Sequence, residues 1–273
     1  MSHVLVHAPS YQSFADVLVF AADVATSLDA ALTALYAQPV TLPTLVMDAP
    51  VIIDDVFREL IAERDKACAA SAAFERWAHA RSVRHGAWQV VDEFVDDALA
   101  AAGNWHDFIV IGRNTGHSVS TPAALGDLLV KIGHPCLIVP ERCSRPAVPR
   151  RVLVAWNGSR EAILSIHAAR PLLRKAQSIV LLAATGDPAL AGTAWHPPFD
   201  IGRYVEAEGL HAQIEPFDAG GDAGAALLEA AAAHDADLLV MGAYGRSRLS
   251  EWTLGGATRH VLRHAELPLF MRH

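Results

Sequence analysis

The chain has few cysteines, no long apolar run and no basic cluster, and each absence excludes a class of protein. Its 273 residues include three scattered cysteines, so we expect a reduced, cytoplasmic protein without a disulfide framework. No stretch approaches the roughly 20 uncharged apolar residues of a transmembrane helix, and the amino terminus lacks a signal-peptide pattern. With a net charge of −8, binding to nucleic acid is not expected either.

Motifs of common catalytic classes are also missing. No G-x4-G-K-[ST] occurs, which excludes a P-loop ATPase at the level of the motif. The segment Gly116-His-Ser118-Val-Ser120 resembles the G-x-S-x-G elbow of hydrolases, but several residues separate Ser118 from the predicted strand end at Gly112. We therefore do not expect an enzyme.

A histidine pair near the carboxyl terminus has a spacing that suits a metal ion. His260 and His264 lie one helical turn apart in a predicted helix. No nearby cysteine or carboxylate in the sequence completes a site, and the helix dipole also favours histidine near a helix carboxyl terminus. From the sequence alone we expect no metal site.

What the chain does carry is a glycine pattern in its last quarter. The apolar run Asp237–Gly242 predicts a buried strand, Gly245 a turn, and Gly255-Gly256 the start of a helix over 252–265. Free N–H groups and the positive end of the helix dipole would point into this turn. Strand, turn and helix together predict an anion cradle, most often for phosphate. The alternative is that the glycines only pack a helix against a sheet.

The pattern of elements repeats on both sides of a proline-containing linker at 141–149. Strands alternate with helices in each half, which predicts two α/β domains with open parallel sheets, residues 1–142 and 149–273. The predicted strands are 4–8, 31–37, 88–91, 108–112, 136–139, 151–155, 179–182, 211–217, 237–242 and 267–271. The predicted helices are 13–28, 92–102, 122–133, 160–174, 199–208, 222–234 and 252–265, with an extra helical region at 51–82.

The spacing Gly242-x2-Gly245-x9-Gly255-Gly256 resembles the G-x2-G-x9-G-[ST] motif of the universal stress protein family. Three glycines match, and Gly256 stands where the family has Ser or Thr, so that Thr258 is a candidate substitute. The resemblance implies two tandem Rossmann-like domains of the adenine-nucleotide α-hydrolase type that form an intrachain pseudo-dimer. It implies a nucleotide site made of Asn157, Ala184, Gly242, Gly245, Arg246, Gly255, Gly256 and Thr258, with Asn157 at the position of the family's Asp.

The first half departs further from the motif. Pro9 stands at the position of the family's Asp, and the glycine turn reads Gly112-x3-Gly116-x9-Gly126-Asp127, one residue too long in its first gap. A carboxylate at Asp127 would repel phosphate. We expect a degenerate pocket here, and one nucleotide per chain.

The resemblance therefore implies a stress-response regulatory protein that binds AMP or ATP, with Mg²⁺ as an optional companion. The alternatives are a nucleotide-free interaction scaffold and a slow ATP hydrolase. An unidentified protein partner and a further homodimer are part of the expectation. Strands 136–139 and 267–271 should pair antiparallel, and Gly242→Val should abolish nucleotide binding without unfolding the protein.

Overall fold

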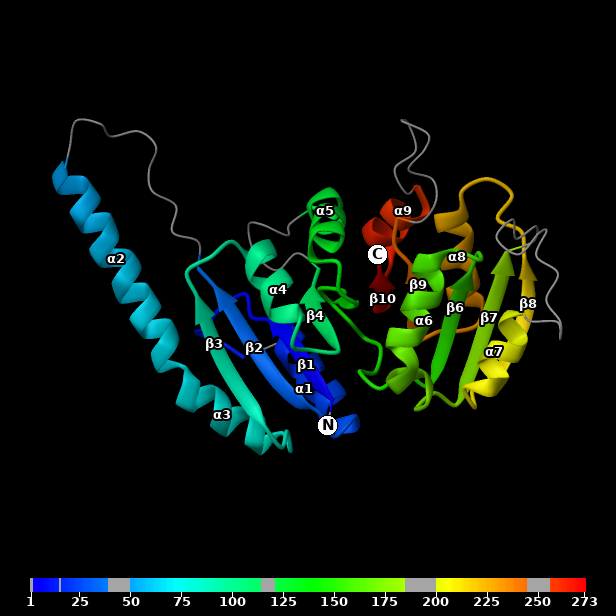
Figure 1. Cartoon of the computed structure of the whole chain (residues 1–273), viewed down its shortest axis with the longest axis horizontal. Coiled ribbons are helices and arrows are strands. Elements are labelled where there is room, and N and C mark those ends of the chain that lie inside the picture. The colour runs from blue at the N-terminus through cyan, green and yellow to red at the C-terminus, as the bar shows by residue number, and fades with distance from the viewer. Residues whose placement is uncertain (1, 15, 39–49, 114–120, 185–199, 245–255) are drawn as a thin grey trace. The chain divides into compact units, whose positions relative to one another are not determined.

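Strands and helices alternate along the computed structural model, as the apolar runs and glycine turns predict. The structure describes residues 2–14, 16–38, 50–113, 121–184, 200–244 and 256–273, without the side chains of 50–56 and 122. These residues form two compact units, Met1–Val110 and Ile111–His273 (Figure 1). The domains 1–142 and 149–273 were predicted from the repeated pattern of elements in the sequence, and that division stays a prediction.

The first unit contains a parallel sheet in the order β3-β2-β1-β4. Its strands are β1 (His3–His7), β2 (Ala31–Ala37), β3 (Gly86–Val91) and β4 (Phe108–Gly112, whose last two residues count with the second unit). Its helices are α1 (Val17–Ser27), α2 (Pro50–Ala69), α3 (Ser71–Ala80) and α4 (Val95–Gly103). The extra helical region predicted at 51–82 is thus two helices, of which α3 lies along β3.

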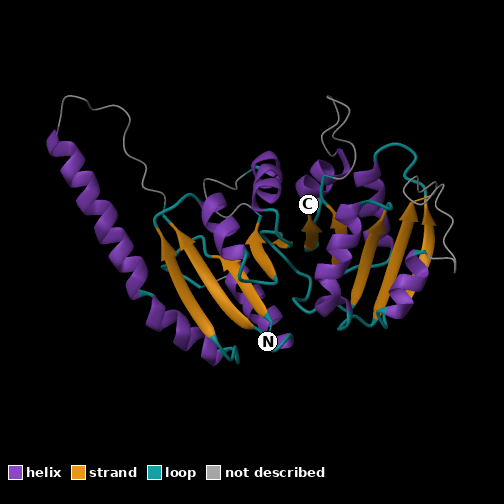
Figure 2. Ribbon diagram, in the orientation of Figure 1, coloured by secondary structure: helices purple, strands orange, loops and turns teal. Residues whose placement is uncertain are grey.

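The second unit contains strands in the order β5-β10-β9-β6-β7-β8. They are β5 (Cys136–Val139), β6 (Arg151–Trp156), β7 (Ser178–Ala184), β8 (Ala212–Phe217), β9 (Leu238–Gly242) and β10 (Leu269–Arg272). The helices are α5 (Pro122–Ile132), α6 (Arg160–Leu173), α7 (Ile201–Ala207), α8 (Ala223–Ala233) and α9 (Gly256–His264). Figure 2 shows α6 and α7 on one face of this sheet, with α8 behind it, as right-handed crossovers require.

The two closing strands pair antiparallel, as predicted. In β5 and β10, Ile138 lies opposite Leu269 and Leu137 opposite Phe270, whereas the other described ladders of the second unit are parallel. All four residues are buried. Each strand therefore covers an edge of the other that would otherwise expose unpaired backbone groups.

Equivalent aspartates hold the start of β1 in the first unit and of β6 in the second. The Asp107 carboxylate accepts a hydrogen bond from the backbone of His3 at 2.8 Å. In the second unit the buried Asp237 carboxylate accepts from the backbone N–H groups of residues 150 and 151, both at 2.9 Å. The sequence likeness of 107–112 and 237–242 thus has a structural counterpart.

Candidate functional site

The strand order of the second unit creates a switch point between β6 and β9. From β6 the chain proceeds to β7 and β8 on one side, then crosses to β9 and β10 on the other. In open α/β sheets, the helices that follow the two strands at such a point leave towards opposite faces, and ligands bind at the carboxyl ends of these strands. The predicted site residues Asn157, Ala184, Gly242 and Gly256 follow or end β6, β7 and β9, or begin α9.

The turn after β6 orients the Asn157 side chain. Its Oδ1 accepts a hydrogen bond from the backbone N–H of Ser159 at 3.1 Å, and Gly158 adopts a φ of 71° between them. The Ser159 hydroxyl then caps α6 by accepting from the N–H of Ala162 at 3.1 Å. Asn157 itself is exposed, so its amide NH₂ can donate to a ligand.

Ala184 ends β7 at the same edge of the sheet. It pairs with Phe217 of β8 and is half-buried. The segment 185–199, which continues the chain from this edge, lies outside the described residues. Ala184 therefore lies at the sheet edge where the resemblance implies a contact between its backbone and adenine, and that contact stays a prediction.

Gly242 is required by packing against α6. A Cβ added to it would lie 2.6 Å from the backbone nitrogen of Ala162 and 2.8 Å from the carbonyl carbon of Glu161. These are backbone atoms, which cannot move aside as a flexible side chain can. Gly242 therefore lets the first turn of α6, and with it the turn of Asn157, approach the end of β9.

Gly256 and Thr258 lie in the first turn of α9, and they differ in how much of them is available to a ligand. A Cβ on Gly256 would meet no atom within 4 Å, and the residue is exposed. Thr258 is buried, and its hydroxyl accepts a hydrogen bond from the backbone N–H of Tyr244 at 3.3 Å. Thr258 thus holds the glycine turn, which limits its use as a substitute for the missing Ser or Thr. Gly245, Arg246 and Gly255 lie outside the described residues.

Tyr244 is a residue of the turn that sequence reasoning missed. It has a φ of 55°, a conformation that is uncommon for a residue with a side chain. Its hydroxyl fills the space beside Gly126 of α5, where an added Cβ would lie 1.8 Å from the oxygen. Burial, and next the charge of Asp127, raise the pKa of the Tyr244 hydroxyl. No spacing signal marks Tyr244, because the motif specifies only its glycines.

Gly126 itself lies inside α5 and not at its start. Helix α5 begins at Pro122, behind a Thr121 cap whose hydroxyl accepts from the N–H of Ala124 at 3.1 Å. Free N–H groups occur only in the first turn of a helix. Gly126 therefore cannot cradle a phosphate at a helix start, and the exposed Asp127 follows it. Residues 114–120, which include Gly116 and Ser118, lie outside the described residues.

In the first unit, the counterpart of β6 is β1, which ends in a buried histidine. His7 is 4% exposed, and its Nδ1 has no hydrogen-bond partner. Burial lowers the pKa of His7 to about 4, so the ring is neutral near pH 7. Pro9, two residues further, is exposed and carries no group that could replace an acidic ligand contact.

Metal sites and membrane-spanning helices are considered for the described residues alone. Over the described ranges, no group of three or more His, Cys, Asp or Glu side chains is placed to hold a metal ion. In the same part of the chain, no helix has the length and apolar character needed to cross a bilayer.

Comparison with known proteins adds to this geometry. Residues 149–272 match the model of the Universal stress protein family. The chain resembles a universal stress protein from Archaeoglobus fulgidus DSM 4304 with a TM-score of 0.64 and 16% identity, over 99% of this chain and 96% of that chain. It resembles a functionally unknown protein from Pseudomonas aeruginosa PAO1 with a TM-score of 0.55 and 17% identity, over 98% of this chain and 91% of that chain. No curated protein matches. At such identities these structures establish the α/β fold.

Proposed function

Since residues 149–272 belong to the universal stress protein family, we propose that the second unit binds one adenine nucleotide, AMP or ATP, and acts as a nucleotide-dependent regulator. The observation that carries the proposal is the switch point between β6 and β9, with the first turn of α9 joined to the residues after β9 by the hydrogen bond from Tyr244 to Thr258. Ligands of open α/β sheets bind at such a point, and phosphates bind at helix starts.

Each described site residue has a role that its surroundings allow. The Asn157 amide, fixed by Ser159, would donate to the sugar. The backbone at Ala184 would meet the base. Backbone N–H groups at the start of α9 would bind phosphate, with Gly245, Arg246 and Gly255 as further members of the cradle. Mg²⁺ would accompany ATP, coordinated by oxygens of its phosphates.

The proposal is tested first on the purified protein, without assuming a ligand. Denaturing the protein and identifying released small molecules by mass spectrometry should yield an adenine nucleotide. Calorimetry on nucleotide-free protein should then give one site per chain. Absence of any binding or thermal shift would favour the interaction scaffold. Release of phosphate from ATP by the wild type would favour the slow hydrolase.

Gly256 offers a matched pair of variants. Gly256→Ser restores the hydroxyl of the family motif, and Gly256→Ala adds the same Cβ without it; open space at this position accommodates both. A hydrogen bond to a charged group contributes about 1.5–3 kcal/mol, or roughly one to two decades of affinity. ATP should bind more tightly to the Ser variant alone. Equal affinities for both variants would contradict this account of the missing hydroxyl.

The expectation that the first half binds no nucleotide has its own test. Asp127→Ser removes the carboxylate but leaves Gly126 inside α5, so the stoichiometry should stay at one nucleotide per chain. Two sites of similar affinity in the wild type would refute the asymmetry between the halves.

A further inference from the structure

A cavity of about 400 Å³ lies between α8 and α9 in the second unit. Residues 221–223 and one face of α9 line it, and the lining includes Gly256 of the candidate nucleotide site but no residue of β6, β7 or β9. Four of the α9 side chains that line it are basic or imidazole groups: Arg259, His260, Arg263 and His264. Of the described residues of the candidate nucleotide site, Asn157, Ala184, Gly242 and Thr258 do not line this cavity.

Gly224 brings the two helices together at this point. An added Cβ would lie 2.5 Å from the Cβ of His260 and 2.9 Å from the carbonyl oxygen of Ala257. The second residue of α8 therefore has to be a glycine for α9 to lie this close. As a result His260 comes within reach of the residue that caps α8.

That capping residue, Asp222, contacts both its own helix and His260. Its Oδ1 accepts from the N–H groups of Gly224 at 2.9 Å and Ala225 at 3.2 Å, and its Oδ2 lies 2.7 Å from Nδ1 of His260. The hydrogen bonds from Ala225 and Gly224, and then His260, hold the pKa of the Asp222 carboxyl below its usual range. A carboxylate can only accept, so Nδ1 of His260 donates and the neutral ring carries its lone pair on Nε2.

His264 has the same tautomer for a different reason. Its Nδ1 lies 3.0 Å from the carbonyl oxygen of His260, and a carbonyl also only accepts. The two rings have centroids 4.4 Å apart and planes at 45°. Two imidazoles one turn apart on a helix thus both leave Nε2 as the electron-pair donor.

From this arrangement we propose that His260 and His264 chelate one divalent transition-metal ion of the Zn²⁺, Ni²⁺ and Cu²⁺ class through their Nε2 atoms. Imidazole suits these ions, whereas Mg²⁺ and Ca²⁺ prefer oxygen ligands. Asp222 acts as the carboxylate that orients a metal-bound histidine from outside the coordination sphere. Water fills the other positions, since the described residues supply no third ligand of the His, Cys, Asp or Glu type.

Arg259 and Arg263 line the same cavity, and their charges oppose a cation. The site should therefore bind more weakly than a closed structural zinc site with four protein ligands. The two guanidinium groups can also hold an anion beside the metal. The proposal does not depend on nucleotide binding, because it uses none of the residues after β6 and β7.

The test uses the full chain without an affinity tag and Zn²⁺ as the probe, measured by competition with a chromogenic chelator. The wild type should bind one Zn²⁺ per chain at its tightest site. His260→Ala and His264→Ala should each weaken binding by at least about tenfold. Asp222→Asn should weaken it by about tenfold while Asn still caps α8. In NMR spectra, Zn²⁺ should shift the ring resonances of His260 and His264 first.

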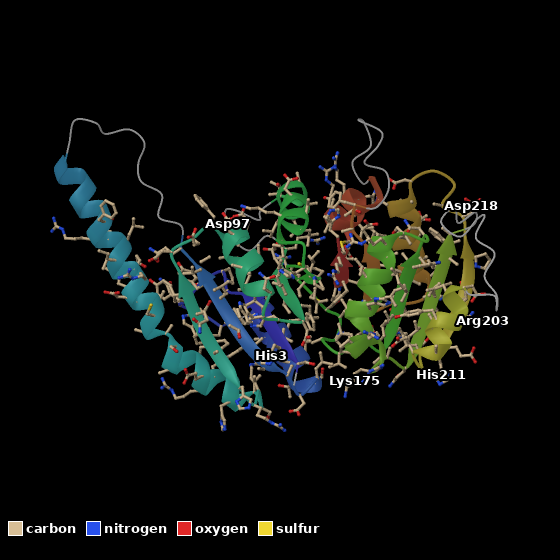
Figure 3. The ribbon with its side chains drawn as sticks, viewed as in Figure 1. His3, Asp97, Lys175, Arg203, His211 and Asp218 are labelled. Carbon is tan, nitrogen blue, oxygen red and sulfur yellow. The ribbon has the colours of Figure 1, made fainter. Side chains whose placement is uncertain are left out.

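The control is His211→Ala, which removes an exposed histidine just before β8 (Figure 3) and should leave the affinity unchanged. Circular dichroism checks that each variant is folded, and His264, exposed at the end of α9, can be replaced without opening the core. Wild-type affinity in folded His264→Ala would overturn the chelate. Wild-type affinity in Asp222→Asn would overturn the supporting role of the carboxylate. Binding of inorganic phosphate without binding of Zn²⁺ would overturn the assignment of a metal.

Discussion

Gly242→Ala is the substitution for which the structure makes the sharpest prediction. The added methyl group would lie 2.6 Å from the nitrogen of Ala162, 2.8 Å from the carbonyl carbon of Glu161 and 2.9 Å from its Cβ. Ordinary carbon contacts begin near 3.5 Å, so either α6 or the end of β9 must shift. The expectation that Gly242→Val would spare the fold is therefore contradicted, because a larger side chain at this position increases the overlap.

The magnitude follows from packing energetics. Forcing an extra methyl group into a closely packed site costs about 1–3 kcal/mol. Gly256→Ala is the matched control, because the same methyl group meets no atom within 4 Å there. Replacing Gly by Ala in a helix is worth up to ~1 kcal/mol in the favourable direction. The two variants should thus change the free energy of unfolding in opposite directions.

Urea unfolding followed by circular dichroism measures this difference. Because the chain has two units, hydrogen–deuterium exchange should localise the effect: Gly242→Ala should speed exchange in the first turn of α6, and Gly256→Ala should not. A Gly242→Ala protein as stable as the wild type would refute the argument that this glycine is needed for close approach. A destabilisation confined to residues outside α6 and β9 would refute its location.

Three other predictions concern two buried side chains, His7 and Asp237, and one exposed side chain, Asp235. His7 has a pKa of about 4 when folded against an ordinary 6.5; the unfolded chain thus binds the proton more readily, and stability should fall by about 3 kcal/mol as pH drops from 6.5 to 4. In His7→Leu, urea titrations at pH 7 and pH 5 should show a smaller difference than in the wild type; an unchanged difference would assign the pH dependence elsewhere. Asp237→Ala leaves two backbone N–H groups without their acceptor and should cost about 2–3 kcal/mol. Asp235→Ala breaks exposed ion pairs with Arg145 and Arg151 and should cost much less than Asp237→Ala, because water screens exposed charges; equal losses for the two aspartates would contradict the role of burial.

The elements and their order follow from the sequence because they depend on local pattern. The apolar run Leu238–Met241 is buried along its length, and the Ser159 and Asp222 caps are formed where a polar residue precedes a helical period. The expected parallel sheet also predicted that Asn157, Ala184 and Gly242 would end or follow strands at one edge; their contacts with a ligand stay predictions. Such signals need only neighbouring residues, and the chain's alternation of strands and helices then leaves few topologies.

Contacts between elements far apart in sequence were decided by the tertiary structure alone. Three such contacts depend on how closely particular helices and strands pack. They are the approach of Gly242 to Ala162, the hydrogen bond between Thr258 and the backbone of Tyr244, and the contact of Asp222 with His260. Sequence spacing identified the histidine pair but not the carboxylate on another helix. Packing fixes such contacts to within tenths of an ångström. The spacing of residues along the sequence does not give the distance between elements that come together only when the chain folds.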